Sequence, residues 1–169
     1  MKNIPIIIPF KETSMRCPNK NFTLFPYAIQ WLDRQNISKF DIYVVSKSDK
    51  VKQLAEMHNV NFIYEKEQTN PNDIIATTDV AKSFGFQQYI FLPLTQPIKN
   101  ANLIADVVDA LQSSDCDFVT TYQTITDRSL FYLDDNLKFL NESKNRKGCM
   151  CKEMKMLDGA IYGIKLSFS

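Results

Sequence analysis

Five side chains suited to anion binding follow the first apolar segment of the chain. The segment 4–9 reads Ile-Pro-Ile-Ile-Ile-Pro, and the loop after it carries three cations and two hydrogen-bonding groups, which are Lys11, Arg16, Lys20, Ser14 and Asn21. Such a loop can neutralise much of the charge of a triphosphate while its backbone N–H groups donate further hydrogen bonds. On charge alone, a solvated basic loop explains the same residues equally well.

The segments around this loop predict an α/β fold. Apolar stretches typical of strands (4–9, 41–46, 60–64, 89–93 and 117–122) alternate with amphipathic stretches typical of helices (26–35, 49–58, 73–84 and 102–113). The strand segments lack strict alternation, as expected for parallel strands that are covered on both faces. We therefore expect a doubly wound, mostly parallel sheet, with the basic loop at the carboxyl end of its first strand, where such sheets bind ligands. Pro26 is expected in the first turn of its helix.

The chain is 169 residues long, which fits a single domain spanning 1–169. After residue 122 the pattern changes to a hairpin with arms at 130–133 and 137–140, followed by a polar stretch and a last strand at 157–164. We interpret about 128–156 as a hairpin or dimer-arm excursion from the main sheet.

Charge and composition exclude several classes of function. The net charge is +1, whereas general nucleic-acid or membrane-surface binders carry a strong basic excess. No apolar segment reaches the length of a membrane span, and the four cysteines are scattered along the chain. We expect a reduced, cytoplasmic protein that binds neither nucleic acid nor membrane.

The pattern of the opening residues resembles a known family. The segment Ile8-Pro-Phe-Lys-Glu-Thr-Ser-Met-Arg-Cys-Pro-Asn-Lys-Asn21 resembles the motif I-P-A-R-x-G-S-K-R-x-P-x-K-N of the acylneuraminate cytidylyltransferases, which include the CMP-sialic acid synthetases. The similarity continues in register at 44–49, 73–80, 91–99 and 157–162.

This resemblance implies a Rossmann-like nucleotidyltransferase fold and transfer of CMP from CTP to a nonulosonic, sialic-type sugar acid, with release of pyrophosphate. It further implies Mg²⁺ as cofactor, a homodimer and a role in surface polysaccharide synthesis. By resemblance, Lys11, Ser14, Arg16 and Lys20 bind the triphosphate, and the three cations among them serve catalysis. Asn21, Asp73 and Thr77 would contact the nucleotide, and Thr95 and Gln96 the sugar acid. The resemblance identifies no metal ligand in this chain.

Two alternatives stay open. Glu12 and Thr13 stand where the family has small residues, Met15 and Pro93 replace a lysine and a glutamine, and the sequence ends before the family's aspartate-bearing segment. A catalytically inactive nucleotide-binding or assembly homologue is therefore the first alternative. The second is a nucleotide-sugar transferase of related fold that uses Asp115 and Asp117 as a D-x-D metal motif, although residues that precede a strand should lie at the opposite end of the sheet from the chemistry.

Overall fold

A computed structural model describes residues 4–14, 17–65, 73–97, 99–113, 115–125 and 154–166. The chain divides into two units, one formed by 1–121 with 159–169 and the other by 122–158. The expected hairpin arms and most of the excursion at 128–156 lie outside the described residues, so the excursion and the single-domain organisation stay predictions.

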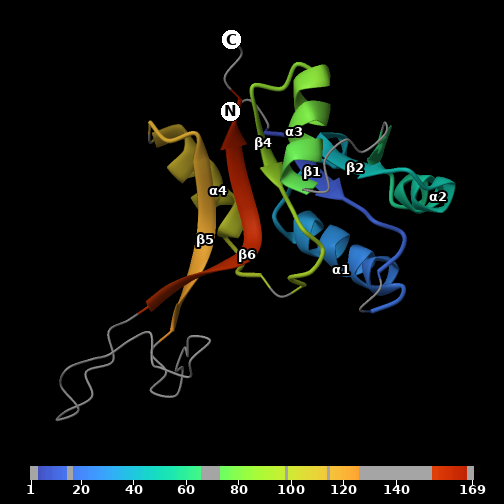
Figure 1. The fold of residues 1–169 in the computed structure, drawn as a ribbon, viewed down its shortest axis with the longest axis horizontal. Coiled ribbons are helices and arrows are strands. Elements are labelled where there is room, and N and C mark those ends of the chain that lie inside the picture. The colour runs from blue at the N-terminus through green and yellow to red at the C-terminus, as the bar shows by residue number, and fades with distance from the viewer. Residues whose placement is uncertain are drawn as a thin grey trace, which may run out of the picture. The chain divides into compact units, whose positions relative to one another are not determined.

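Six strands form one sheet in the order β3-β2-β1-β4-β6-β5 (Figure 1). Strands β1, β2, β3 and β4 pair in parallel, whereas β6 runs antiparallel to β4 with Phe91 opposite Tyr162. The mostly parallel α/β sheet predicted from the sequence is thus confirmed. The strand bounds are β1 Ile6–Pro9, β2 Ile42–Ser46, β3 Asn61–Tyr64, β4 Gln88–Phe91, β5 Phe118–Ile125 and β6 Met154–Lys165.

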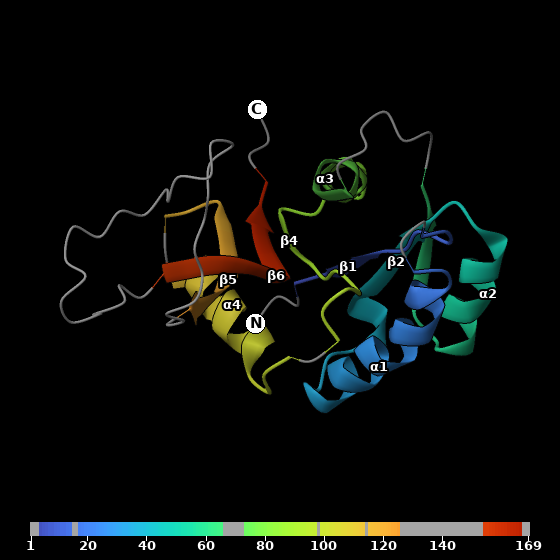
Figure 2. The ribbon, with the colours of Figure 1, turned by 60° about the horizontal axis from the view of Figure 1, so that its bottom comes forward.

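Helices cover both faces of the sheet, as a doubly wound fold requires. Their bounds are α1 Lys20–Arg34, α2 Asp49–Met57, α3 Asp73–Ser83 and α4 Leu103–Ser113, with a short 3₁₀ turn, η1, at Lys39–Asp41. Helices α1, α2 and α4 pack against one face and α3 against the other (Figure 2). In β1, Ile6 and Ile8 face the first helix layer and Ile7 faces α3, and all three are fully buried. Burial on both faces is why this segment shows no polar alternation.

Helix α1 begins at Lys20, well before the start predicted at residue 26. Pro26 lies inside the helix and is exposed, so its predicted first-turn position is wrong. The aromatic rings of Phe22 and Phe25 pack edge-on against Phe10, with ring centroids 5.0 and 5.7 Å apart. We attribute the early start to this packing, since tertiary contacts of an apolar face supply most helical stability and can offset the hydrogen bond that proline removes. As a result, Lys20 and Asn21 belong to the first turn of a helix rather than to a loop.

Candidate functional site

The candidate site lies at the edge of the sheet where the parallel strands end. Strands β1, β2 and β3 reach this edge side by side, so the residues that follow them come together. Helix α3 begins at the same edge, because its first residue, Asp73, contacts Lys11 just beyond β1. Open α/β sheets bind their ligands at this end.

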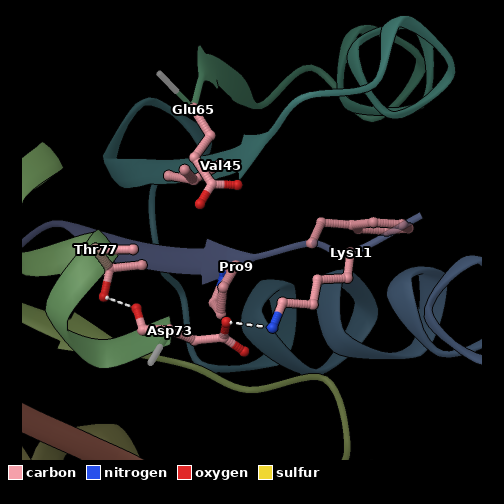
Figure 3. Close-up of a pocket in the computed structure, with 8 residues that line it drawn as sticks. Pro9, Lys11, Val45, Glu65, Asp73 and Thr77 are labelled. Atoms are coloured by element: carbon pink, nitrogen blue, oxygen red, sulfur yellow. Dashed lines mark hydrogen bonds and ion pairs between the residues drawn. The ribbon is translucent and has the colours of Figure 1, made fainter. Parts of the chain in front are cut away.

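A small pocket occupies this edge (Figure 3). Its cavity measures about 10 Å³, which leaves room for about one water molecule. Three of the residues predicted from the sequence to bind nucleotide line it, although they come from two elements far apart in the chain. The lining residues are Pro9, Phe10, Lys11, Val45, Glu65, Asp73, Ala76 and Thr77.

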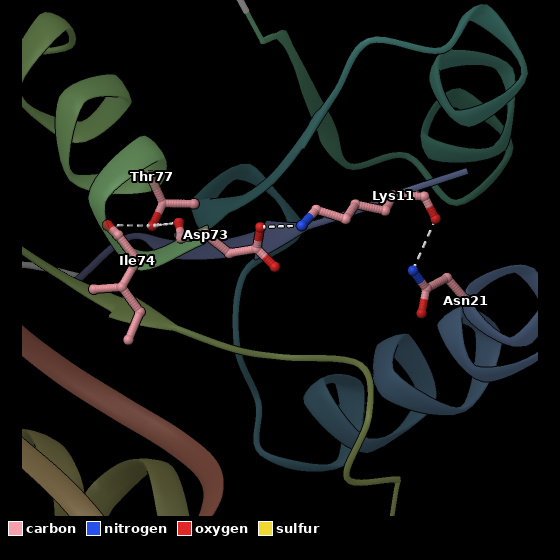
Figure 4. A network of polar contacts seen from close by, with 5 residues as sticks. All are labelled: Lys11, Asn21, Asp73, Ile74 and Thr77. Atoms are coloured by element: carbon pink, nitrogen blue, oxygen red, sulfur yellow. Dashed lines mark hydrogen bonds and ion pairs between the residues drawn. The ribbon is translucent and has the colours of Figure 1, made fainter. Parts of the chain in front are cut away.

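An ion pair spans the pocket from the loop after β1 to the start of α3. The Lys11 Nζ atom lies 2.7 Å from Asp73 Oδ1 (Figure 4). The two side chains are 51% and 37% exposed, so the pair is well solvated and weak, on the order of 0–1 kcal/mol. A more highly charged anion can therefore displace Asp73 from Lys11 at small cost.

Glu65 is a pocket residue that the sequence analysis missed. It directly follows β3, and its backbone N–H donates to the Ser46 carbonyl at 2.9 Å, which continues the β2–β3 pairing. Burial raises the pKa of its carboxyl above the ordinary value; Lys47 opposes this shift and the negative charge of Asp73 adds to it. A carboxylate placed immediately after a strand of a parallel sheet was the signal that could have identified it.

Thr77 forms part of the pocket wall, but its hydroxyl is already engaged within the protein. The side chain is 1% exposed, and Oγ1 is within hydrogen-bonding distance of the Asp73 carbonyl at 2.8 Å and the Ile74 carbonyl at 3.0 Å (Figure 4). The Tyr89 hydroxyl lies 3.4 Å from Thr77 Oγ1 and 2.8 Å from Thr78 Oγ1. These contacts join α3 to β4 and hold the pocket wall in place.

The loop after β1 is held by one contact to helix α1 and by one contact within the loop. The Asn21 side-chain amide donates to the Lys11 carbonyl at 2.8 Å, and the Cys17 N–H donates to Ser14 Oγ at 3.4 Å. Lys20 opens α1, whose first N–H groups lack partners within the helix and favour a nearby anion. Lys11, Ser14, Lys20 and Asn21 thus surround one loop, whereas Arg16 and Met15 lie outside the described residues.

Glu12, the acidic departure from the family pattern, has a cation partner at the start of α2. Its Oε1 atom lies 3.4 Å from Lys50 Nζ. A hydrogen bond with the Ser48 side chain, and then the Lys50 charge, hold the pKa of the Glu12 carboxyl below its usual range. The added carboxylate therefore ties the loop to α2, and it does not line the pocket.

The two residues predicted to contact a sugar acid lie in the connection between β4 and α4. Thr95 is exposed and Gln96 is half-buried. The Gln96 carbonyl accepts a hydrogen bond from Lys99, whose Nζ atom lies 5.7 Å from the centre of the Trp31 ring. Neither residue lines the pocket at Lys11 and Asp73.

Asp115 and Asp117 are far from this edge. The Asp117 carbonyl accepts a hydrogen bond from the Lys165 N–H at 2.8 Å, and Lys165 pairs with Gln88, the first residue of β4. This contact places Asp117 at the amino end of β4, opposite the pocket, as expected from its position before a strand. A D-x-D metal site serving the pocket is therefore not supported.

Within the described ranges, no three His, Cys, Asp or Glu side chains gather in a way that could hold a metal ion. These residues thus do not form a Mg²⁺ site by themselves. In the same part of the chain, no helix combines the length and the apolar character needed to cross a bilayer.

Comparison with known proteins places the fold. No protein-family model matches the chain, and no curated protein matches it. Among solved structures, CMP:2-keto-3-deoxy-manno-octonic acid synthetase complexed with CTP superposes with a TM-score of 0.70 at 13% identity, over 97% of this chain and 74% of that one. For 4-diphosphocytidyl-2C-methyl-D-erythritol synthase from Anaerococcus prevotii the TM-score is 0.64 at 14% identity, over 97% and 71%.

A cytidylyltransferase from Leptospira borgpetersenii is similar with a TM-score of 0.51 at 19% identity, over 72% of this chain and 53% of that one. At these identities the likeness shows the fold and nothing further. The chain therefore has the α/β nucleotidyltransferase-type fold that the sequence predicted.

Proposed function

We propose that this chain binds CTP at the carboxyl edge of its sheet and transfers the CMP group to a sugar acid of the nonulosonic type. One observation carries this proposal. Lys11, Asp73 and Thr77, which the sequence singled out for nucleotide binding, line one pocket although more than sixty residues separate the first from the others. The fold is shared with a synthetase whose solved structure contains CTP.

The proposed reaction is a substitution at the α-phosphorus of CTP. The anomeric hydroxyl oxygen of the sugar acid forms a bond to the α-phosphorus, the bond from that phosphorus to the bridging oxygen breaks, and pyrophosphate leaves. The hydroxyl proton passes to solvent or a nearby base. Such transfers depend mainly on positioning and on neutralising the phosphate charge. We assign this neutralisation to Lys11, Arg16 and Lys20, with Ser14 donating a hydrogen bond.

The remaining predicted residues have positioning roles in the proposal. Asn21 holds the Lys11 carbonyl and thereby the shape of the loop. Asp73 and Thr77 would border the nucleoside, Asp73 after releasing Lys11 to the phosphates. Thr95 and Gln96, beyond β4, would border the sugar acid.

We include Mg²⁺ as an ion that enters with CTP. Magnesium is commonly held by substrate phosphates together with one or two carboxylates. Because the described residues do not form a metal site by themselves, we assign no step of the reaction to the ion. A cytoplasmic homodimer that supplies activated sugars for surface polysaccharide is part of the same proposal and rests on the resemblance of the sequence.

A catalytically silent nucleotide-binding homologue is the second candidate. Two features favour this candidate. Lys11, the cation that lines the pocket, is already paired with Asp73, and Pro93 stands where the family has a glutamine. This protein would bind CTP without turning it over.

Pyrophosphate release tests the proposal. The protein is incubated with CTP, Mg²⁺ and a panel of nonulosonic acids that includes 2-keto-3-deoxy-manno-octonic acid, while CTP binding is followed separately by calorimetry. Acceptor-dependent release of pyrophosphate supports the transferase. Binding without release supports the silent homologue, and absence of any nucleotide binding refutes both.

A further inference from the structure

Glu65 places a carboxyl group in a pocket that apolar and polar residues share. The apolar walls come from Pro9, Phe10, Val45 and Ala76, and the polar ones from Lys11, Asp73 and Thr77. Figure 3 shows the Glu65 side chain reaching from the end of β3 toward Val45, separate from the Lys11–Asp73 pair. The backbone contact with Ser46 fixes the base of this side chain at the edge of the sheet.

The acidic groups of this edge differ in their partners. Asp73 is paired with Lys11, and Glu12 is paired with Lys50. Among the described residues, Glu65 has no salt bridge within 4 Å, and burial already raises the pKa of its carboxyl. Burial costs free energy because it removes water from the ionised carboxylate. A ligand group that donates a hydrogen bond to the carboxylate would offset this cost, whereas a group that presents only a lone pair would increase it.

We propose that Glu65 selects the nucleobase by accepting a hydrogen bond from the exocyclic amine of cytosine. This inference rests on the proposed function, because it assumes that a nucleotide occupies the pocket. Cytosine carries an N4 amine, which is a donor that Asp and Glu accept from, where uracil carries an oxygen that would face the carboxylate lone pairs. Glu65 is thus a specificity-determining residue.

The size of the cavity agrees with recognition of an edge of the base. A cavity of about 10 Å³ admits a group no larger than a water molecule, which is the size of an amine. The ring would then lie toward the mouth, where the side chains of Lys11 and Asp73 are 51% and 37% exposed and can move aside.

The test is a comparison of nucleotide affinities by calorimetry. CTP, UTP and 2′-deoxy-CTP are titrated into wild type, Glu65→Gln and Glu65→Ala. Glu56→Gln serves as the matched control, because it removes the same charge from an exposed position of α2 outside the pocket. Removing a negative charge strengthens binding of both triphosphates alike, so the readout is the ratio of CTP to UTP affinity rather than either affinity alone.

We expect wild type and Glu56→Gln to prefer CTP, and both Glu65 variants to lose about tenfold of that preference. Glutamine relaxes selection because its amide can donate to the uracil oxygen as well as accept from the amine. Equal affinity of wild type for CTP and UTP, or an unchanged ratio in either folded variant, overturns the inference while leaving CTP binding intact. A change confined to the ratio of CTP to 2′-deoxy-CTP also overturns it, since Glu65 would then contact the ribose. If wild type binds none of the nucleotides, the proposed function itself fails.

Discussion

Replacing Lys11 by glutamine removes the cation closest to the pocket while keeping a side chain of similar length. The proposed function gives Lys11 two partners at different stages. In the free protein its ammonium lies 2.7 Å from Asp73, and in the proposed complex it contacts phosphate. The change in binding free energy on substitution is therefore the difference between the free energies of these two contacts.

That difference can be worked out from the exposure of the pair. Charge-assisted hydrogen bonds contribute about 1.5–3 kcal/mol, and a solvated ion pair such as Lys11–Asp73 contributes about 0–1 kcal/mol. The net loss of CTP affinity is then about 0.5–3 kcal/mol, a factor of roughly two to one hundred and sixty. The free energy of unfolding should fall by less than about 1 kcal/mol, so weaker binding will not reflect unfolding.

Calorimetric titration with CTP and with CMP checks this prediction, alongside urea unfolding. Lys82→Gln is the matched control, because Lys82 is an exposed lysine on α3 that does not line the pocket. We expect Lys11→Gln to weaken the binding of CTP by the factor given above. The binding of CMP should weaken much less, because CMP lacks the β- and γ-phosphates. The effect should also shrink as salt concentration rises.

Affinities for CTP that agree within twofold between wild type and Lys11→Gln would refute a phosphate contact by Lys11. Equal losses for CMP and CTP would show that the lysine contacts the nucleoside or the first phosphate instead. Either result would leave the ion pair with Asp73 as a structural contact only.

The remaining predictions concern binding, pH and packing. Lys20→Ala should weaken CTP binding by about 1–3 kcal/mol in the same titration, since a charge-assisted contact to phosphate is lost; unchanged affinity would remove Lys20 from the site. The pKa of Glu65 is raised in the folded protein above the ordinary 4.5, so ionised Glu65 lowers the free energy of unfolding at neutral pH. This destabilisation disappears as the pH falls below about 4.5, where the carboxyl is protonated in both states. Glu65→Gln should accordingly raise the melting temperature relative to wild type more at pH 7 than at pH 4, and an equal difference at both would contradict the shift. Gly163→Ala should lower the free energy of unfolding in urea by about 1–3 kcal/mol, because a Cβ there would lie 2.8 Å from Val107 Cγ1. An unchanged urea midpoint would mean that α4 can shift enough to accommodate the added methyl group.

The elements with continuous apolar composition were predictable from the sequence. The segment Ile6, Ile7 and Ile8 is buried on both faces, and this burial produces the uniform composition that identifies a parallel strand. The start of α1 was not predictable in the same way, because it depends on Phe22 and Phe25 packing against Phe10 from the preceding loop. Local rules for proline give the wrong boundary when tertiary packing dominates.

The residues of the candidate site also differ in how far they were predictable from the sequence. Lys11, Ser14, Lys20 and Asn21 are close in sequence, so their grouping was visible there. Glu65 gave only a weak signal, its position directly after a strand, because an acid at the end of an edge strand is ordinarily solvated. Only the approach of α3 and the side chain of Val45 make it a pocket residue. The antiparallel pairing of β6 with β4 was likewise not predictable, because the apolar composition of a strand does not indicate its direction.

The two walls of the pocket, helix α3 and the loop after β1, differ in how easily they can move, because hydroxyl contacts join α3 to β4. Moving α3 would break the contacts of Tyr89 with Thr77 and Thr78 in the interior. The loop after β1 is held instead by exposed contacts of Lys11, Glu12 and Asn21, each of which can be exchanged for solvent. In the proposed complex, adjustment to the nucleotide would therefore fall on the loop. Substitutions in the loop should then change ligand binding without disturbing the contacts between α3 and β4.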